Sequence, residues 1–199
     1  MSYFVDDDEY IYLKPNSISH EVCDFLIDLF ESAEPGVVKT GTVVGGFLPE
    51  INKTFDMKLN PSINKFDQTL YHEISLTLNS YFEGSKHKKV APLLKNISDN
   101  GYHIQKYESN SGYYNYHEDE MIEYTGNTVK KRVLTFIWYL NTVEQGGETE
   151  FFNGRIKIKP EKGKLLVFPS TWTYMHKGNI PVSNDKYIVT GWVWSDILP

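Results

Sequence analysis

The chain has 199 residues, of which 40% are hydrophobic and 15% aromatic, so the composition predicts a packed globular protein and excludes a disordered one. Its formal net charge of −6 disfavours binding to nucleic acid and favours a basic or neutral peptide as partner. Cys23 is the only cysteine, which excludes an internal disulfide and predicts a reducing compartment.

The first residues of the chain are acidic and lack the basic start and apolar run of a secretory signal peptide. No apolar stretch approaches the ~20 residues that a membrane-spanning helix needs. We therefore expect a cytoplasmic protein without membrane contacts. Two basic runs, residues 86–89 and 130–132, are interpreted as solvated faces, because neither is long enough to reverse the overall charge.

Two stretches of the first half place apolar residues at helical spacing. The first helix is predicted to begin after Ser19, an N-cap residue, and to end before residues 35–36. The second is predicted to have Asn60 as its cap and Pro61 at its first position, and to end at residues 83–84. The expected buried residues are Val22, Cys23, Phe25, Leu26, Leu29 and Phe30 in the first helix and Ile63, Phe66, Leu70, Ile74, Leu78 and Phe82 in the second.

Residues 37–59, between these helices, mix valines with glycines, which is typical of short strands joined by a mobile hairpin or loop. From residue 102 onward, alternating apolar residues predict strands separated by turns. Many short strands at regular spacing are typical of a sandwich or barrel, and a jelly roll closes them into two facing sheets with a ligand-sized opening. The predicted strands are residues 102–107, 132–140, 155–158, 164–168 and 187–194.

His117 and Asp119 form an H-x-D pair, and alternation along a strand would place both side chains on one face. His176 is the candidate third ligand, because a rolled sheet can bring distant strands together. Two imidazoles and one carboxylate would form the facial triad that is typical of non-heme Fe(II) oxygenases. An H-x-D pair alone is common, so a structural role stays open. The other histidines, His20, His72, His87 and His103, are interpreted as hydrogen-bonded surface or core residues.

Lys186 and Thr190 share one predicted strand, and Tyr139 lies on another. A cation flanked by hydroxyl groups suits a dianionic co-substrate such as 2-oxoglutarate. One end of that molecule can chelate iron, while its far carboxylate needs a fixed positive charge in a poorly hydrated place. The alternative is that Lys186 is an ordinary exposed lysine, as most lysines are.

The second half of the chain resembles the catalytic domain of prolyl 4-hydroxylases within the 2-oxoglutarate/Fe(II)-dependent dioxygenase superfamily. Several motifs occur in the same order over roughly residues 100–195, which is more specific than any single motif. They are Tyr107-x4-Gly112-x-Tyr114-x2-His117-x-Asp119, the run from Arg132 to Asn141, the run from Gly146 to Phe151, Pro160-x2-Gly163, Phe168-Pro169, His176-x-Gly178-x2-Pro181-Val182, Lys186 and Trp192.

The resemblance implies a mainly β fold with supporting helices (α+β): a double-stranded β-helix, or jelly roll, with N-terminal helices packed on one sheet. It implies a single dioxygenase domain over residues 1–199. Residues 1–99 would form a helical support layer and substrate loop, and residues 100–199 the catalytic jelly-roll core. Residues 38–58 would fold over a peptide substrate.

The resemblance also implies individual roles. The implied metal ligands are His117, Asp119 and His176. The implied 2-oxoglutarate site consists of Lys186 at the far carboxylate, Tyr139 and Thr190 as hydroxyl donors, and Tyr107 near the iron. Fe(II), 2-oxoglutarate and O2 would take part, with ascorbate as a reductant. By contrast, Gly146 and Gly147 are interpreted as a turn, and Trp192 and Trp194 as packing residues.

The implied function is hydroxylation of a prolyl residue in a peptide or protein to 4-hydroxyproline, with release of succinate and CO2. The same chemistry on a free amino acid or another side chain is the first alternative. A metal-binding jelly roll that acts as a sensor without catalysis is the second. Formation of succinate would separate the enzymes from the sensor, and stimulation of turnover by peptide would separate the two enzymes.

Overall fold

A computed structural model describes residues 2–5, 8, 10–43, 46, 48–83 and 95–196 of the chain. Several sequence predictions lie outside these residues: the helix end at Gly84, the basic run 86–89 with His87, and the loop residues Val44, Gly45 and Phe47. Among the described residues, no helix is long and apolar enough to cross a membrane.

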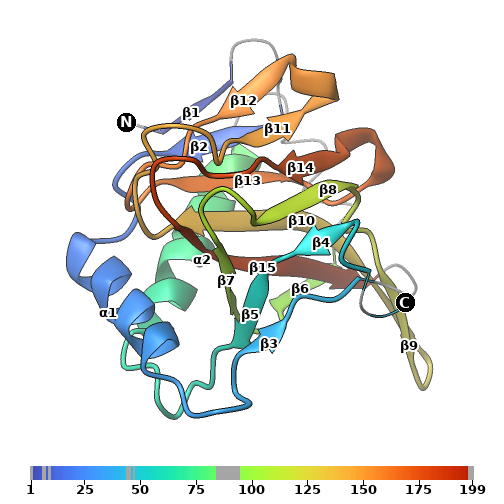
Figure 1. Cartoon of the computed structure of the whole chain (residues 1–199). Coiled ribbons are helices and arrows are strands. Elements are labelled where there is room, and N and C mark those ends of the chain that lie inside the picture. Colours follow the sequence, from blue (N-terminus) through green and yellow to red (C-terminus); the bar gives the residue numbers. More distant parts are fainter. Residues whose placement is uncertain are drawn as a thin grey trace.

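Two antiparallel sheets face each other, and helices cover the outer side of the larger sheet (Figure 1). The strands of the larger sheet, in pairing order, are β1 (Tyr3–Phe4), β2 (Tyr12–Lys14), β13 (Leu165–Pro169), β10 (Thr128–Tyr139), β15 (Lys186–Asp196), β7 (His103–Tyr107), β5 (Phe55–Lys58) and β3 (Lys39–Thr40). Two more strands pair outside this order: β6 (Lys95–Asp99) pairs with β15, and β9 (Ile122–Thr125) pairs with β10. The smaller sheet contains β12 (Ile156–Ile158), β11 (Thr149–Phe151), β14 (His176–Gly178), β8 (Tyr113–His117) and β4 (Asn52–Lys53). The predicted jelly roll is therefore confirmed.

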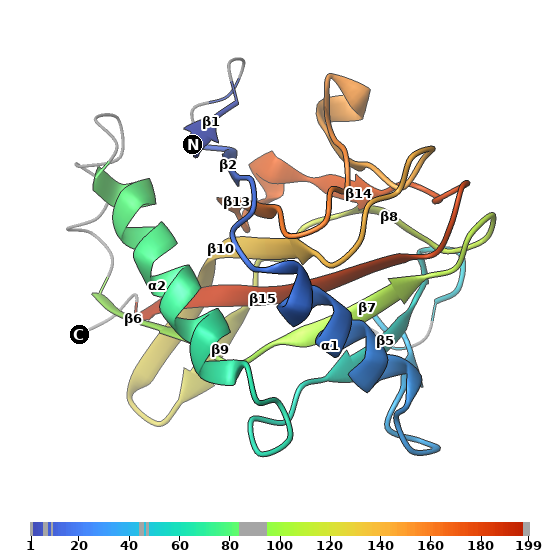
Figure 2. The same ribbon diagram turned by 90° about the vertical axis from the view of Figure 1, so that its left-hand side faces the viewer.

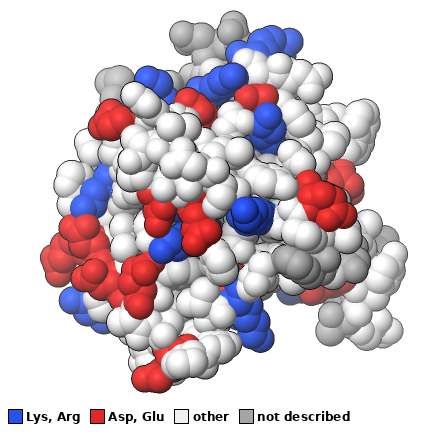
Figure 3. Space-filling model, in the orientation of Figure 1, with Lys and Arg blue, Asp and Glu red and all other residues white. Residues whose placement is uncertain are grey.

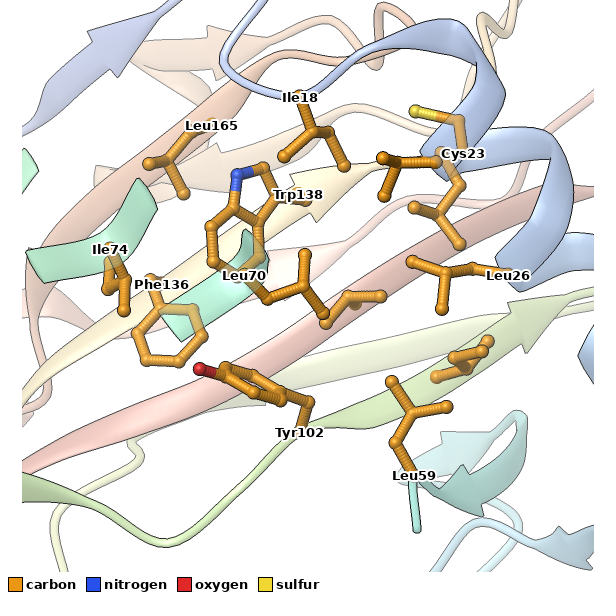
Figure 4. Packing of buried hydrophobic residues seen from close by; sticks show 14 of the residues in the cluster. Ile18, Cys23, Leu26, Leu59, Leu70, Ile74, Tyr102, Phe136, Trp138 and Leu165 are labelled. Atoms are coloured by element: carbon orange, nitrogen blue, oxygen red, sulfur yellow. The ribbon is translucent and has the colours of Figure 1, made fainter. Parts of the chain in front are cut away.

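The helices α1 (His20–Glu31) and α2 (Asp67–Glu83) lie across the outer face of β15 and β10, as the view in Figure 2 shows. The first helix has the predicted cap, since the Ser19 hydroxyl accepts a hydrogen bond from the Val22 N–H at 3.3 Å. Its predicted core residues Cys23 and Leu26 are fully buried. Figure 4 shows Leu26, Leu70 and Trp138 meeting between the two helices and the sheet.

The second helix begins later than predicted, at Asp67. Residues 60–66 form turns instead, because the side chains of Asn60 and Asn64 each accept a hydrogen bond from the backbone amide two residues on, at 2.9 and 3.1 Å. Asparagine that bonds in this way stabilises turns at the expense of helix. Ile63 is 56% exposed, so its predicted burial is wrong. The other predicted residues of this helix do face the core, with Leu70 and Ile74 buried and Phe66, Leu78 and Phe82 partly buried.

The strands predicted for the second half are present as β7, β10, β12, β13 and β15, with small shifts at their ends. The predicted short strands between the helices are β3, β4 and β5. Residues 1–99 thus supply strands to both sheets besides the helical layer. The sequence analysis did not predict β1, β2, β6, β9, β11 or β14, and it placed His117 on a strand without giving the bounds of β8. Most of these are too short to show a clear alternation, and their pairing with distant strands stabilises them.

Alternation along β15 divides its side chains between two environments. Val189 and Val193 pack toward the helices in the larger apolar core. Ile188 belongs to a second core between the two sheets, together with Tyr139 and Phe168. The outer face of the large sheet therefore holds the helices, and its inner face is available for a site between the sheets.

Replacing Leu26 with alanine is expected to lower the free energy of unfolding by about 2–5 kcal/mol, because a fully buried leucine is lost from the junction of α1 and the sheet. Urea unfolding followed by circular dichroism measures this change. The matched control is Asp28→Ala on the exposed side of the same helix, which should stay within about 0.5 kcal/mol of the parent. Equal losses in both variants would contradict this description of the helix face.

Candidate active site

A cavity of about 400 Å³ lies between the two sheets. One wall is the inner face of the large sheet, and the other comes from β8 and β14 of the small sheet. Four alternate residues of β15 line it, namely Lys186, Ile188, Thr190 and Trp192. Of the residues that the sequence analysis singled out, this cavity also contains Tyr107, His117, Asp119 and His176.

His117, Asp119 and His176 converge in this cavity. One nitrogen or oxygen atom from each side chain can be chosen so that all three lie within 4.8 Å of one another. His176 Nε2 lies 3.6 Å from Asp119 Oδ2, and His117 Nε2 lies 3.9 Å from Asp119 Oδ1. Within the described ranges, no other group of three histidine, cysteine or acidic side chains is placed to share an ion.

Pairing of β8 with β14 places the two histidines directly opposite each other, with ring centres 4.2 Å apart. The prediction that Asp119 shares a strand with His117 is wrong, because β8 ends at His117. The Asp119 backbone N–H instead donates a hydrogen bond to the Ser170 carbonyl at 3.2 Å, which fixes the chain after β8 beside the end of β13. This backbone contact with residue 170, and not strand alternation, therefore places Asp119 beside His117.

Hydrogen bonds orient all three side chains. The Nδ1 atoms of His117 and His176 lie 2.7 Å and 3.2 Å from the backbone carbonyls of Asn115 and Tyr174. Each Nδ1 therefore carries the proton, and each Nε2 keeps its lone pair for a ligand. The Thr135 hydroxyl donates to Asp119 Oδ2 at 2.8 Å and holds the carboxylate from behind.

Apolar rings surround the histidines. The ring of Phe168 lies 4.6 Å from that of His176, and Tyr114 stacks on His117 at 3.5 Å. Burial lowers the pKa of His176 to about 3 and also lowers the pKa of His117. Both imidazoles are therefore neutral near pH 7, which is the form that binds a metal ion. Two neutral imidazoles and a carboxylate on one side of a cavity fit Fe(II) and leave coordination positions open.

Lys186 is buried in the same cavity, with 1% of its surface exposed. The alternative that it is an ordinary exposed lysine is therefore wrong. Its Nζ lies 4.5 Å from the ring centre of Tyr107 and 5.8 Å from that of Tyr139. Within the part of the chain that the structure describes, no carboxylate lies within salt-bridge distance of it, and burial lowers its pKa to about 7, an effect that the charge of Glu148 partly offsets. A buried cation without a paired anion is suited to bind an anionic ligand.

The two predicted hydroxyl donors, Tyr139 and Thr190, and the predicted neighbour of the iron, Tyr107, differ in their surroundings. Tyr107 lines the cavity opposite Lys186 in the β7–β15 pairing, and it lies against Gly178, where an added Cβ would come within 2.7 Å of the Tyr107 ring. Thr190 also lines the cavity, although its hydroxyl already donates to the Phe136 carbonyl at 3.2 Å. Tyr139 lies behind the wall. Its hydroxyl donates to the Thr149 hydroxyl at 2.7 Å, and Thr149 is the group that reaches the cavity.

Arg132 and Trp192 form a further part of the wall. The guanidinium carbon of Arg132 lies 3.8 Å from the ring centre of Trp192 and 5.2 Å from that of Trp194. The interpretation of residues 130–132 as a solvated face is therefore wrong for Arg132, which is half-buried and lines the cavity. The Nε atom of Arg132 and the Nε1 atom of Trp192 are buried donors without a hydrogen-bond partner among the described residues. Trp192, which was interpreted as a packing residue, also lines the cavity.

Sequence reasoning also missed two polar residues of the wall, Asp56 on β5 and Gln105 on β7. Both lie in strands that pair with each other, and neither belongs to a motif. Gln105 lies in a predicted strand that also contains His103 and Lys106, so its polar side chain gave no distinct signal. His103, interpreted as a non-ligand, lies against Trp192 with ring centres 5.7 Å apart and is not part of the three-residue group.

Comparison with known proteins agrees with this geometry. The sequence profile of the 2OG-Fe(II) oxygenase superfamily matches residues 102–194. Prolyl 4-hydroxylase 13 of Arabidopsis thaliana is 32% identical over 112 residues, which are 45% of this chain and 38% of that relative. The chain thus spans well under two thirds of that curated relative.

Solved structures share the fold over nearly the whole chain. The viral collagen prolyl hydroxylase of Paramecium bursaria Chlorella virus-1, solved as a 2OG complex, has a TM-score of 0.67 at 21% identity, covering 96% of this chain and 99% of its own. A Trichoplax adhaerens prolyl hydroxylase, in complex with a hypoxia inducible factor peptide fragment, has a TM-score of 0.72 at 18% identity, covering 95% and 85%. The profile match over residues 102–194 and the three-residue group make the chain similar to the 2OG-Fe(II) oxygenase superfamily, and the solved prolyl hydroxylases share its fold.

Proposed function

We propose that this chain is a 2-oxoglutarate-dependent dioxygenase that hydroxylates a prolyl residue of a peptide or protein to 4-hydroxyproline, with release of succinate and CO2. One observation carries the proposal: a convergent His117–Asp119–His176 group and an unpaired buried Lys186 line the same cavity. A non-catalytic metal-binding sensor would have no need for the buried cation. The relatives named above, which are prolyl hydroxylases, support prolyl residues as the substrate class.

In this proposal His117, Asp119 and His176 hold Fe(II) through two Nε2 atoms and a carboxylate oxygen. When bound, the iron with 2-oxoglutarate and O2 supplies the oxidising chemistry, and ascorbate would serve as its reductant. The carbonyls of Asn115 and Tyr174 keep the imidazole protons on Nδ1. No side chain has to act as a general base.

Lys186 pairs with the far carboxylate of 2-oxoglutarate in this proposal. Because Lys186 is 1% exposed and its Nζ lies 4.5 Å from the ring centre of Tyr107, the ion pair would be less hydrated and stronger than at the surface. Tyr107, Thr149 and Thr190 supply the nearby hydroxyl groups. Tyr139 would not contact the co-substrate itself, and its hydroxyl orients the hydroxyl of Thr149 through a hydrogen bond.

The peptide would enter beside Arg132 and Trp192, whose unpartnered N–H groups are suited to donate to backbone carbonyls of an extended chain. Residues 38–58 remain the proposed substrate loop, and Thr42 and Val43 from this segment line the cavity. We also propose a cytoplasmic, reducing setting, which the buried free thiol of Cys23 supports.

The test is incubation of proline-containing peptides with the protein, Fe(II), 2-oxoglutarate and O2, followed by mass spectrometry and succinate determination. Addition of one oxygen atom to a proline, in step with succinate, is the expected result. Succinate formation that peptides do not stimulate would point to a free amino acid or another small substrate. Absence of succinate under all conditions would contradict the enzyme.

The affinity for 2-oxoglutarate is expected to fall as the pH rises above about 7. Burial lowers the pKa of Lys186 to about 7, so the free protein carries the ammonium below that pH and loses it above. Binding of the dianion above this pH then requires uptake of a proton, and the dissociation constant should rise by up to about tenfold per pH unit. Calorimetric titration of the metal-loaded protein with 2-oxoglutarate, in buffers of different ionisation enthalpy, measures both the dissociation constant and the number of protons taken up. A pH-independent constant would contradict the lowered pKa.

A further inference from the structure

Asp56 places a carboxyl group in the wall of the active-site cavity. It lies on β5, which pairs with β7 so that Asp56 is opposite Gln105. Gln105 in turn is opposite Ile188 of β15, and all three residues line the cavity. Asp56 therefore belongs to the same face of the large sheet as Lys186, and it lies within residues 38–58, the proposed substrate loop.

This carboxylate has hydrogen-bond donors around it and no cation. The Thr54 hydroxyl donates to Asp56 Oδ1 at 2.8 Å, and the Gln105 amide donates to Oδ2 at 3.4 Å. Within the described ranges, no lysine, arginine or histidine lies within salt-bridge distance of Asp56, although such pairs satisfy many other acidic residues of the chain. Burial raises its pKa to about 6, an effect that the two hydrogen bonds partly offset.

A half-buried carboxylate without a cation costs stability, and proteins keep such groups where a ligand supplies the missing charge. The wall positions on either side are already assigned: Lys186 faces the co-substrate, and Arg132 and Trp192 face the peptide backbone. Asp56 serves none of these, because a carboxylate would repel 2-oxoglutarate and cannot donate to a carbonyl. A positively charged group of the substrate remains as the matching ligand.

We propose that Asp56 is a specificity-determining residue that binds a positively charged side chain, lysine or arginine, close to the prolyl residue that is hydroxylated. This inference rests on the proposed function, because it takes the substrate to be a peptide. The net charge of −6 would also attract a basic segment, and Figure 3 shows acidic side chains gathered over the region of α1, where Asp24, Asp28 and Glu31 are exposed.

The experiment compares peptides in which one position near the proline carries lysine, its uncharged analogue norleucine, or glutamate, and it moves this position along the peptide. For each peptide, both kcat/KM and the dissociation constant from fluorescence anisotropy are measured. At one or two positions the parent protein should prefer lysine over norleucine by about tenfold to hundredfold, as a charge-assisted hydrogen bond predicts. Glutamate at the same position should bind more weakly than norleucine.

Asp56→Asn keeps the size of the side chain and removes its charge, so it should abolish the preference for lysine and leave the norleucine peptide and 2-oxoglutarate within about twofold of the parent. Thr54→Val is the matched control, because it removes a hydrogen bond to Asp56 and keeps the charge, so the preference should survive. Asp56→Ser provides a second uncharged variant if the asparagine variant does not fold.

Three outcomes would overturn the inference. The parent protein could show no preference for lysine at any position, or Asp56→Asn could retain the preference. The third is that Asp56→Asn weakens 2-oxoglutarate and all peptides alike, which would make Asp56 a positioning residue that acts on Tyr107 through Gln105, whose Oε1 accepts from the Tyr107 hydroxyl at 3.4 Å. Failure of the proposed function would give a different result. Lysine peptides would then still bind more tightly than norleucine peptides, but no peptide would gain an oxygen atom.

Discussion

Alanine at His117, Asp119 or His176 is expected to abolish turnover while leaving the fold intact. Each side chain supplies one of three ligand atoms within 4.8 Å, and three protein ligands are already few for an Fe(II) site, so the loss of one releases the ion or spoils its geometry. None of the three fills the main core between the helices and the large sheet, so thermal unfolding should change little.

Iron content and succinate release are measured on the purified, folded variants. Thr135→Val supplies a graded comparison, because it removes only the hydroxyl that orients Asp119 and should weaken metal binding by about tenfold to hundredfold. His72→Ala is the matched control, since it deletes an imidazole from the exposed side of α2. Parent-like activity in any one of the three alanine variants would remove that residue from the proposed metal site.

Lys186→Met is expected to weaken 2-oxoglutarate binding by at least tenfold to hundredfold, which corresponds to the ~1.5–3 kcal/mol of a charge-assisted hydrogen bond. Methionine is chosen because it keeps most of the volume of a side chain that is 1% exposed, so the loss reports charge rather than a cavity. Metal affinity should stay near the parent value, because Lys186 supplies none of the three ligand atoms.

Lys186→Arg is not expected to rescue binding. The guanidinium is larger and planar, and the enclosed space between Tyr107 and the β15 wall suits a compact ammonium. Calorimetric titration with 2-oxoglutarate measures all three proteins, with Lys159→Met on the exposed surface as the control. If the methionine variant binds 2-oxoglutarate as tightly as the parent, another group holds the far carboxylate.

Local signals predicted the elements that carry their own pattern. The Ser19 cap and the apolar spacing after it located α1. Long strand-like runs bounded by turn signals located β10 and β15, because such runs are recognisable without help from the rest of the chain. The start of α2 was misplaced because Asn60 and Asn64 favour turns over a helix that propensity alone allows.

The sequence by itself determined the chemistry of the candidate site. His117, Asp119, His176 and Lys186 follow from residue types in a recognisable order, and the structure places them in one cavity. Tertiary structure alone decided how they are held. The position of Asp119 depends on its backbone hydrogen bond to the Ser170 carbonyl and not on strand alternation. That contact joins residues far apart in the chain, so no local sequence pattern could predict it.

Only the tertiary structure also decided which other side chains share the cavity. Asp56 and Gln105 meet because β5 pairs with β7, and Arg132 meets Trp192 because β10 lies beside β15. Strand order and register arise from the packing of the whole sheet, and no local pattern around these residues encodes their partners. The chemistry that the chain can perform is therefore readable from its motifs, whereas the features that would select its substrate arise from pairing between distant strands.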